Sequence, residues 1–386
     1  MTPPVTATAP RVALVGAGII GLSIAWRLAR AGCSVDIFDR AEAGRGASHA
    51  AAGMLAASVE AEPGEQPLLP LCLESQRLWP AFAAELEAAS GLPVDLRPEG
   101  TLVLALTRDD LATLRQRYDF HRALGLPLTW LTGAAARDLE PHLTPRAAAA
   151  VHSPADTQVD NRKATAALRQ ALLRAGGRLH EHTPVLALDL DATRARGVIL
   201  PDRAHPADIV VLCAGAWSRD LPGLPPAAQP PVRPVKGQML ALRMPPGAPL
   251  LRHVVWAPKC YLVPRLDGRL LIGATTEEKG WDPALTAGGV LALLEGAFRA
   301  LPAIEELPID ELWTGFRPGS RDDAPLLGPV PGVSGLLLAT GHHRNGILLA
   351  PITADCIAHL ILSDHLDPRI RPFGIDRFQR PPGSIS

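Results

Sequence analysis

Apolar runs and helical patterns alternate at the start of the chain. Residues 12–15 are continuously apolar, as in a parallel strand that is covered on both faces. A helical pattern follows at residues 19–31, and a second apolar run occupies residues 35–38. This order of strand, helix and strand predicts the beginning of a Rossmann-type α/β domain.

The same kind of pattern returns later in the chain. We expect a helix at residues 161–175, which is followed by strands at 178–182, 185–190 and 197–200 and by a buried strand within 207–218. Residues 335–340 form another apolar strand, and a helix is expected to begin near Gly346. The Rossmann-type domain is therefore assembled from discontinuous segments.

The intervening segments have a different character. Residues 237–244 and 259–276 predict strands joined by tight turns, with a hairpin that turns at residues 266–269. Residues 101–124 and 128–143 each indicate a strand followed by a helix, with Thr132 as the N-cap of the second helix. Another helix is expected at 286–301. We predict an inserted α+β domain with an antiparallel sheet.

The predicted domain boundaries follow from these patterns. The Rossmann-type domain takes residues 1–90, 146–228 and 321–386, and the inserted domain takes residues 91–145 and 229–320. We expect the inserted domain to bind the substrate.

A glycine motif stands between the first strand and the first helix. Gly16 permits a tight turn, Gly18 lets the backbone approach a pyrophosphate, and Gly21 lets the helix pack closely on the strand. Asp39 ends the second strand, 18 residues after Gly21, near the spacing expected for an acid that binds ribose hydroxyls. The whole unit predicts dinucleotide binding, and a chance glycine-rich turn is the alternative.

Small residues dominate the segment at residues 44–55, "GRGASHAAAGML". Such a run suits a backbone that lies against a flat ligand, because few side chains stand in the way. A small-residue helix packed tightly in the core is the alternative, and the residue types leave both open. Arg40 follows Asp39, but one arginine does not establish binding of a 2′-phosphate.

Composition excludes several classes of partner. The net charge is −1 and charged residues make up 20% of the chain, so neither nucleic acid nor an anionic membrane is expected as a partner. The first ten residues lack the features of a signal peptide and predict a floppy tail. No segment approaches the roughly 18 apolar residues of a membrane helix. We expect a soluble, cytoplasmic protein.

Cysteines and histidines do not form a metal pattern. The five cysteines are scattered and odd in number, which favours free thiols over disulfides. His342 and His343 are adjacent, so on an extended segment they would point to opposite sides. Zinc needs about four ligands, and no further histidine or cysteine stands at a suitable spacing. We predict no metal site.

Several motifs together resemble a known family. They are "GAGIIG", "ASHAAAGML", "EHTPVLAL", "PVKGQ", "CYLVPR", "WTGFRPGSRDDAPLLG" and "GHHRNGILLAP", and they span most of the chain. On these motifs the sequence resembles the glycine oxidase and D-amino-acid oxidase family of FAD enzymes. The resemblance implies FAD as the cofactor and a homo-oligomer, and we predict that the FAD is bound noncovalently. The resemblance also implies oxidation of glycine, sarcosine or small D-amino acids to imines, with reduction of O₂ to H₂O₂ and a supply of imine for thiazole and thiamine biosynthesis.

The resemblance also implies which residues hold FAD. Besides the three glycines, they are Ile19, Ile20, Asp39, Arg40, Ala47, Ser48, Ala52, Gly53, Met54, Val185, His342, His343, Arg344, Asn345, Gly346, Ile347 and Leu348. The expected helix near Gly346 would direct its positive N-terminal end toward the flavin, and Arg344 would add a full charge. His49 departs from the family pattern, where a smaller or different polar residue is expected.

Three residues are implied at the substrate. Arg317 would bind the carboxylate as a bidentate partner, Tyr261 would donate a hydrogen bond to it, and Arg344 would contribute from the cofactor side. From the residues alone, Arg317 could be a surface arginine before a turn, and Tyr261 an interior strand residue. Lys259 stands where the family carries histidine, which leaves substrate size open.

Two other functions remain open from the sequence. One is a sarcosine or D-amino-acid oxidase, or a dehydrogenase that passes electrons to a quinone. The other is a catalytically silent FAD-binding subunit of a larger complex, against which the Arg317, Tyr261 and Arg344 set argues.

Overall fold

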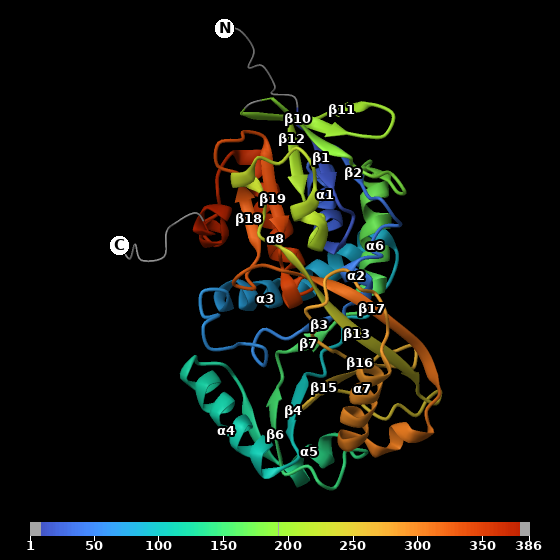
Figure 1. Ribbon diagram of the computed structural model, residues 1–386. Coiled ribbons are helices and arrows are strands. Elements are labelled where there is room, and N and C mark those ends of the chain that lie inside the picture. Colours follow the sequence, from blue (N-terminus) through green and yellow to red (C-terminus); the bar gives the residue numbers. More distant parts are fainter. Residues whose placement is uncertain (1–8, 192, 379–386) are drawn as a thin grey trace.

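The computed structural model describes residues 9–191 and 193–378. Most of the expected tail, residues 1–8, lies outside the described residues, as do the last eight residues of the domain segment that ends at 386. Figure 1 shows two lobes, one built on a mostly parallel sheet and the other on a mixed, largely antiparallel sheet. In the described part of the chain, no helix is both long and apolar enough to cross a membrane.

The first lobe is a Rossmann-type layer of strands covered by helices. Within the described residues its sheet has the order β18 (Leu326–Pro329), β19 (Leu336–Thr340), β12 (Ile209–Leu212), β1 (Arg11–Val15), β2 (Ser34–Phe38) and β8 (Arg178–His180). The pairs from β19 to β8 are parallel, and β18 runs antiparallel to β19. The strand-helix-strand prediction is therefore confirmed.

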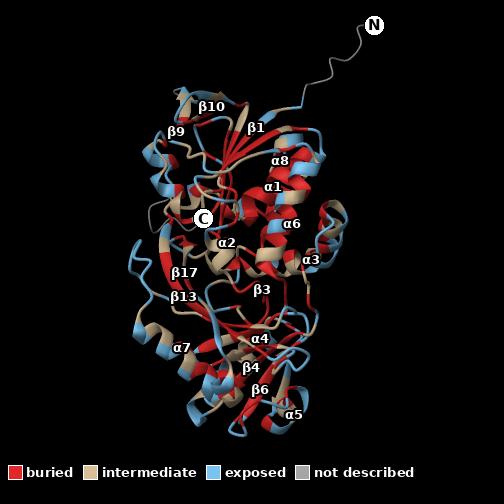
Figure 2. Ribbon diagram, turned by 90° about the vertical axis from the view of Figure 1, so that its right-hand side faces the viewer, coloured by how far each residue is buried: buried red, intermediate tan, exposed pale blue. Residues whose placement is uncertain are grey.

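In the part of the chain that the structure describes, four helices build the core beside this sheet. They are α1 (Ile19–Arg30), α3 (Leu69–Ser90), α6 (Asn161–Arg174) and α8 (Ala350–Ser363). α1 is apolar on nearly all sides because it packs between the sheet and the other helices, and Figure 2 shows α1 and α8 coloured mostly as buried. The rings of Trp26, Trp79 and Phe82 fill the space between α1 and α3.

The second lobe is the inserted α+β domain. Its sheet has the order β17 (Ile309–Gly319), β13 (Arg233–Arg243), β16 (Arg269–Gly273), β15 (Cys260–Pro264), β14 (Val254–Ala257), β4 (Thr101–Ala105), β6 (Ala149–Ser153) and β5 (Thr129–Thr132). Helices α4 (Arg108–Ala123), α5 (Gly133–Leu139) and α7 (Ala287–Ala300) lie in this lobe (Figure 1). The predicted hairpin at 266–269 joins β15 to β16, and Thr132 caps α5 through the amide of Ala135, as predicted.

Smaller elements complete the chain. They are α2 (Ala47–Ala50), the pair β3 (Met54–Leu55) and β7 (Thr157–Gln158), the strands β9 (Ala187–Asp191), β10 (Arg194–Ile199) and β11 (Ala204–Pro206), and short 3₁₀ turns that include Gly215–Asp220 and His343–Asn345. β3 and β7 lie where the two lobes meet.

Two sequence expectations are corrected here. β6 pairs with β4 and β5, so residues 149–153 belong to the inserted domain and not to the segment predicted to begin at 146. The helix expected near Gly346 begins at Ala350 instead. Pro351 explains the second difference, because proline is tolerated in the first turn of a helix but would clash in the interior of one that began at 346.

Candidate active site

A cavity of about 1070 Å³ extends between the two lobes. One end is lined by the glycine turn between β1 and α1, and the other by residues of β13, β15 and β17. The predicted cofactor residues line this cavity, with Gly21 as the exception. Arg317, Tyr261 and Arg344 also line it.

The glycine turn lies at the entrance of α1. Gly16 has φ +104°, and a Cβ there would lie 2.5 Å from the carbonyl oxygen of Cys213. Gly21 is buried behind the cavity wall, and a Cβ there would lie 2.0 Å from the carbonyl oxygen of Gly16, so this close approach of helix and turn requires glycine. Gly18 is the N-cap of α1, and a Cβ there would meet only the Ser48 hydroxyl, at 3.2 Å. Gly18 therefore leaves room for a ligand beside the first-turn amides.

Asp39 is fixed at the edge of the cavity by the backbone. Its carboxylate accepts hydrogen bonds from the amides of Ala17, at 2.8 Å, and Ala41, at 2.9 Å. Arg40 lies over the ring of Trp217, 4.1 Å from the centroid, and Trp217 stacks on Trp281 of the inserted domain. Trp217 lines the cavity and was not expected from the sequence.

The small-residue run lines the cavity and is also closely packed behind, so it is compatible with both interpretations left open by the sequence. Ala47, Ser48, Ala52, Gly53 and Met54 line the cavity, as expected of a wall beside a flat ligand. The run is also tightly packed behind, since a Cβ at Gly53 would lie 2.0 Å from the carbonyl oxygen of Val159.

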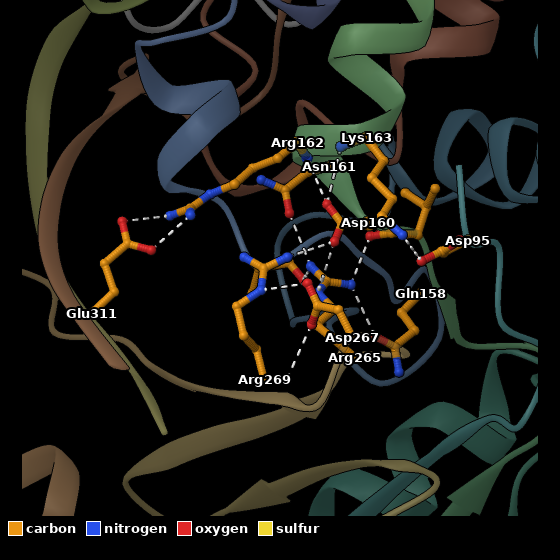
Figure 3. Close-up of polar contacts among 12 residues, drawn as sticks. Asp95, Gln158, Asp160, Asn161, Arg162, Lys163, Arg265, Asp267, Arg269 and Glu311 are labelled. Atoms are coloured by element: carbon orange, nitrogen blue, oxygen red, sulfur yellow. Dashed lines mark hydrogen bonds and ion pairs between the residues drawn. The ribbon is translucent and has the colours of Figure 1, made fainter. Parts of the chain in front are cut away.

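A buried arginine holds this wall against the inserted domain. Arg265, in the β15–β16 hairpin, donates to the carbonyl oxygen of Ala52 at 2.7 Å. It also donates to the side chain of Asn161 at 2.9 Å (Figure 3). Asn161 in turn donates to the carbonyl of Ser48 at 2.7 Å. Burial lowers the pKa of Arg265 to about 10, so the side chain remains charged at neutral pH. Beside Arg265 and Asn161, an ion pair between Arg162 and Glu311, at 2.7 Å, joins α6 to β17.

The two adjacent histidines are neutral. They lie at a 3₁₀ turn, not on an extended segment as expected, and His343 has φ +46°. Burial lowers the pKa of each to about 3. His342 is hydrogen-bonded to Thr353 at 3.2 Å. Among the described residues no group of three or more His, Cys, Asp or Glu side chains could hold a metal ion.

Arg344 does not present a free positive charge. Its guanidinium donates to the carboxylate of Glu60 at 3.1 Å and also pairs with Glu65. The expected full charge beside the cofactor is therefore balanced by two carboxylates. The helix end is displaced too, since α8 begins beyond Leu348, the last residue of this segment in the cavity wall.

Arg317 presents its charge at the far end of the cavity. Its guanidinium donates to the carbonyl oxygen of Thr275 at 3.1 Å, and it forms no ion pair within residues 9–191 and 193–378. A Cβ at Gly237, on the adjacent strand β13, would lie 2.6 Å from this guanidinium. Glycine at 237 is therefore what leaves space for the Arg317 side chain.

Tyr261 lies on β15 at the same end. Its hydroxyl contacts the sulfur of Met239 at 3.3 Å, and its ring lies 5.3 Å from that of Trp256. Burial raises the pKa of Tyr261 to about 12 against the opposing charge of Arg317, so the hydroxyl stays protonated and can donate. A Cβ at Gly273 would lie 2.1 Å from the Met239 sulfur and would crowd the tyrosine ring.

Several residues of this end were missed from the sequence. They are Glu60, Gly237, Met239, Trp256 and Gly273. The two glycines and Met239 have no local signal, because their role depends on neighbouring strands. The Trp256 Nε1–H is buried without a hydrogen-bond partner in the described part of the chain, which fits a cavity that takes a polar ligand.

Comparison with known proteins decides the family. Residues 11–360 match the DAO family, whose members are described as FAD dependent oxidoreductases. The chain belongs to this family. The DAO-family match covers both lobes, which agrees with the α/β fold and its inserted antiparallel sheet.

Similar DAO-family proteins include glycine oxidases. The glycine oxidase of Geobacillus kaustophilus is 39% identical over 370 residues, covering 95% of this chain and 96% of that protein. A bifunctional ThiO/ThiG protein of Synechocystis sp. is also 39% identical, over 96% of this chain and 54% of its own length. The crystal structure of the Geobacillus kaustophilus glycine oxidase matches with a TM-score of 0.88, covering 96% of this chain and 99% of that one.

FAD is the cofactor of the DAO family, and the cavity fits it. The open side of Gly18 at the first turn of α1 would take the pyrophosphate, and Asp39 lies where a ribose would be bound. The wall of residues 47–54 would lie along the flavin and bring it to Tyr261 and Arg317. When bound, FAD supplies a hydride acceptor.

Proposed function

We propose that this protein oxidises glycine to its imine and that O₂ is reduced to H₂O₂. The observation that carries the proposal is the Arg317 guanidinium, which has no ion-pair partner among the described residues and lies beside a protonated Tyr261 at one end of the FAD cavity. A carboxylate is the natural ligand of this pair, since arginine binds it through two parallel hydrogen bonds. The identity to glycine oxidases supports glycine as the substrate.

The protein's part in this reaction is to bind, orient and exclude water. Arg317 and Tyr261 would hold the carboxylate, which fixes the position of the α-carbon. Met239 and Trp256 flank the tyrosine and hold it in place. Holding the C–H bond at near-attack distance from the hydride acceptor accounts for much of the rate that such a site can provide.

The product supports a biosynthetic role. We propose that the imine supplies thiazole formation in thiamine biosynthesis, which the match to a bifunctional ThiO/ThiG protein supports. Feeding labelled glycine to the enzyme together with the thiazole-forming system would test this role. The proposal fails if no label enters the thiazole. Cytoplasmic location and a homo-oligomer stay predictions.

An anaerobic titration tests the reaction itself. The visible absorbance of the oxidised flavin is followed while glycine, sarcosine, D-alanine or D-proline is added, and peroxide is measured after air is admitted. We expect glycine to bleach the flavin and one H₂O₂ to appear per flavin reoxidised. Bleaching by sarcosine or a D-amino acid alone would point to those oxidases. Bleaching without peroxide would indicate a dehydrogenase, and no bleaching by any of them a silent FAD-binding subunit.

We also propose that FAD is held noncovalently. Cys213 and Cys260 line the cavity, and burial raises the pKa of both thiols, so neither is a thiolate at neutral pH. Precipitation of the purified protein with acid should leave all of the yellow colour in the supernatant. Flavin that remains with the pellet would contradict the proposal.

A further inference from the structure

Glu60 lies in the wall of the cavity, and the proposed reaction has not yet assigned it a role. Its side chain is 13% exposed, and its Oε2 accepts a hydrogen bond from Arg344 Nε at 3.1 Å. Arg344 also donates to the backbone carbonyl of Glu60 at 3.2 Å. The other carboxylate oxygen, Oε1, accepts no hydrogen bond from any residue that the structure describes. One oxygen of a fixed carboxylate is therefore available to a ligand.

The cavity wall carries an acidic group and a basic group at separate places. Glu60 and Glu65 share the single guanidinium of Arg344, which leaves one negative charge in excess. Of the two acids only Glu60 lines the large cavity. Arg317, the basic group, has no carboxylate partner in the described segments. An α-amino acid carries the complementary pair, an ammonium group and a carboxylate.

We propose that Glu60 binds the ammonium group of the amino-acid substrate and accepts a proton from it before the α-C–H bond breaks. This inference rests on the proposed function and adds a catalytic residue to it. An N–H bond of the ammonium group breaks, its electron pair stays on nitrogen, and an O–H bond forms on Glu60. The resulting neutral amine can release hydride from the α-carbon, which an ammonium group cannot. The proton leaves Glu60 for solvent once the product has departed.

The surroundings of Glu60 suit a proton acceptor at neutral pH. Burial raises its pKa to about 7, with Arg344 and Arg317 opposing the rise and Asp156 adding to it. A general base works best when its pKa lies near the working pH. The titratable and charged groups that face Glu60 are Arg344, Glu65, Asp156, Arg317, Tyr261 and Cys72. Of these, Arg344 makes a direct hydrogen bond to Glu60, so the control variant changes the other acid that pairs with Arg344.

The pH dependence of kcat/KM for glycine tests the proposal. In the wild type it should rise as pH increases through about 7, because Glu60 must lose its proton. Glu60→Gln keeps the size and the contact with Arg344 but cannot accept a proton. Its flavin reduction by glycine at pH 7 should be about 100-fold slower, within the range of general-base catalysis. The rise near pH 7 should disappear, and activity should instead grow toward the higher pKa of the substrate amine.

Glu65→Gln is the matched control, since it removes the other partner of Arg344 and leaves Glu60 in place. It should retain the rise near pH 7. An unchanged profile in Glu60→Gln, or the same loss in both variants, would overturn the proposal.

Ligand binding separates this inference from the proposed function. Acetate carries the carboxylate but no amine, so Glu60→Gln should bind it at least as tightly as the wild type, as read from the flavin spectrum. Glycine should bind at least 10-fold more weakly to Glu60→Gln than to the wild type at pH 8. If no amino acid reduces wild-type flavin, the proposed function fails, and these two affinities still decide whether Glu60 recognises the amine. Equal weakening of both ligands would mean a structural role only.

Discussion

Arg317→Ala should raise the KM for glycine sharply while the protein stays yellow. Two charge-assisted hydrogen bonds to the substrate carboxylate are lost, at about 1.5–3 kcal/mol each, which corresponds to a roughly 150- to 25,000-fold fall in kcat/KM. The cofactor wall at residues 47–54 is held by Arg265 and Asn161 instead, so FAD content should not change. Steady-state kinetics with glycine and the flavin absorbance of the purified variant provide the two measurements.

Arg317→Lys serves as the control for charge. Lysine keeps the positive charge but lacks the planar guanidinium group. The fall in kcat/KM should therefore be smaller for Arg317→Lys than for Arg317→Ala, but still measurable. Normal oxidation of glycine by Arg317→Ala would show that the carboxylate is bound elsewhere in the cavity.

Gly18→Asp should abolish FAD binding and leave the fold intact. Gly18 is the N-cap of α1, a position where aspartate is among the preferred residues, so the stability of the apoprotein should change by only a few tenths of a kcal/mol. The new carboxylate would point to the place where the pyrophosphate binds. Like charges in contact cost several kcal/mol, so FAD affinity should fall by at least about 100-fold. The flavin-to-protein absorbance ratio and the melting temperature of the apoprotein are the readouts.

Gly18→Ala is the steric control for this change. Its Cβ would need the Ser48 hydroxyl, 3.2 Å away, to move by a few tenths of an ångström, and no charge is introduced. This variant should retain FAD with reduced affinity. A yellow Gly18→Asp protein would place the pyrophosphate away from the first turn of α1.

The nucleotide end of the site could be predicted from the sequence because its residues are neighbours in the chain. Gly16, Gly18 and Asp39 belong to one strand-helix-strand unit, and each is found where that unit places it. The spacing of these residues in the sequence is therefore sufficient to predict where they lie around the turn. Pro351 also carried a signal, because proline limits where α8 can begin, and this constraint was overlooked.

The substrate end could be predicted only in part. The family resemblance supplied Arg317 and Tyr261, but nothing local indicated that Gly237 makes space for the guanidinium from the adjacent strand. The pairing of Arg344 with Glu60 and Glu65 joins segments about 280 residues apart. Such ion pairs depend on tertiary contacts that the sequence does not reveal. The prediction of a free positive charge on Arg344 was therefore wrong, and Glu60 was not recognised as part of the site.

The wall behind Ser48 and Ala52 has a consequence for how the protein is made. Its supports, Asn161, Arg265 and the Arg162–Glu311 pair, all come from segments more than 100 residues later in the chain. The segment at 341–348, which completes the cavity wall, is later still. During synthesis, the glycine turn between β1 and α1 therefore emerges from the ribosome long before the residues that complete the cavity. Coenzyme capture belongs to the end of synthesis, when both lobes can dock around it.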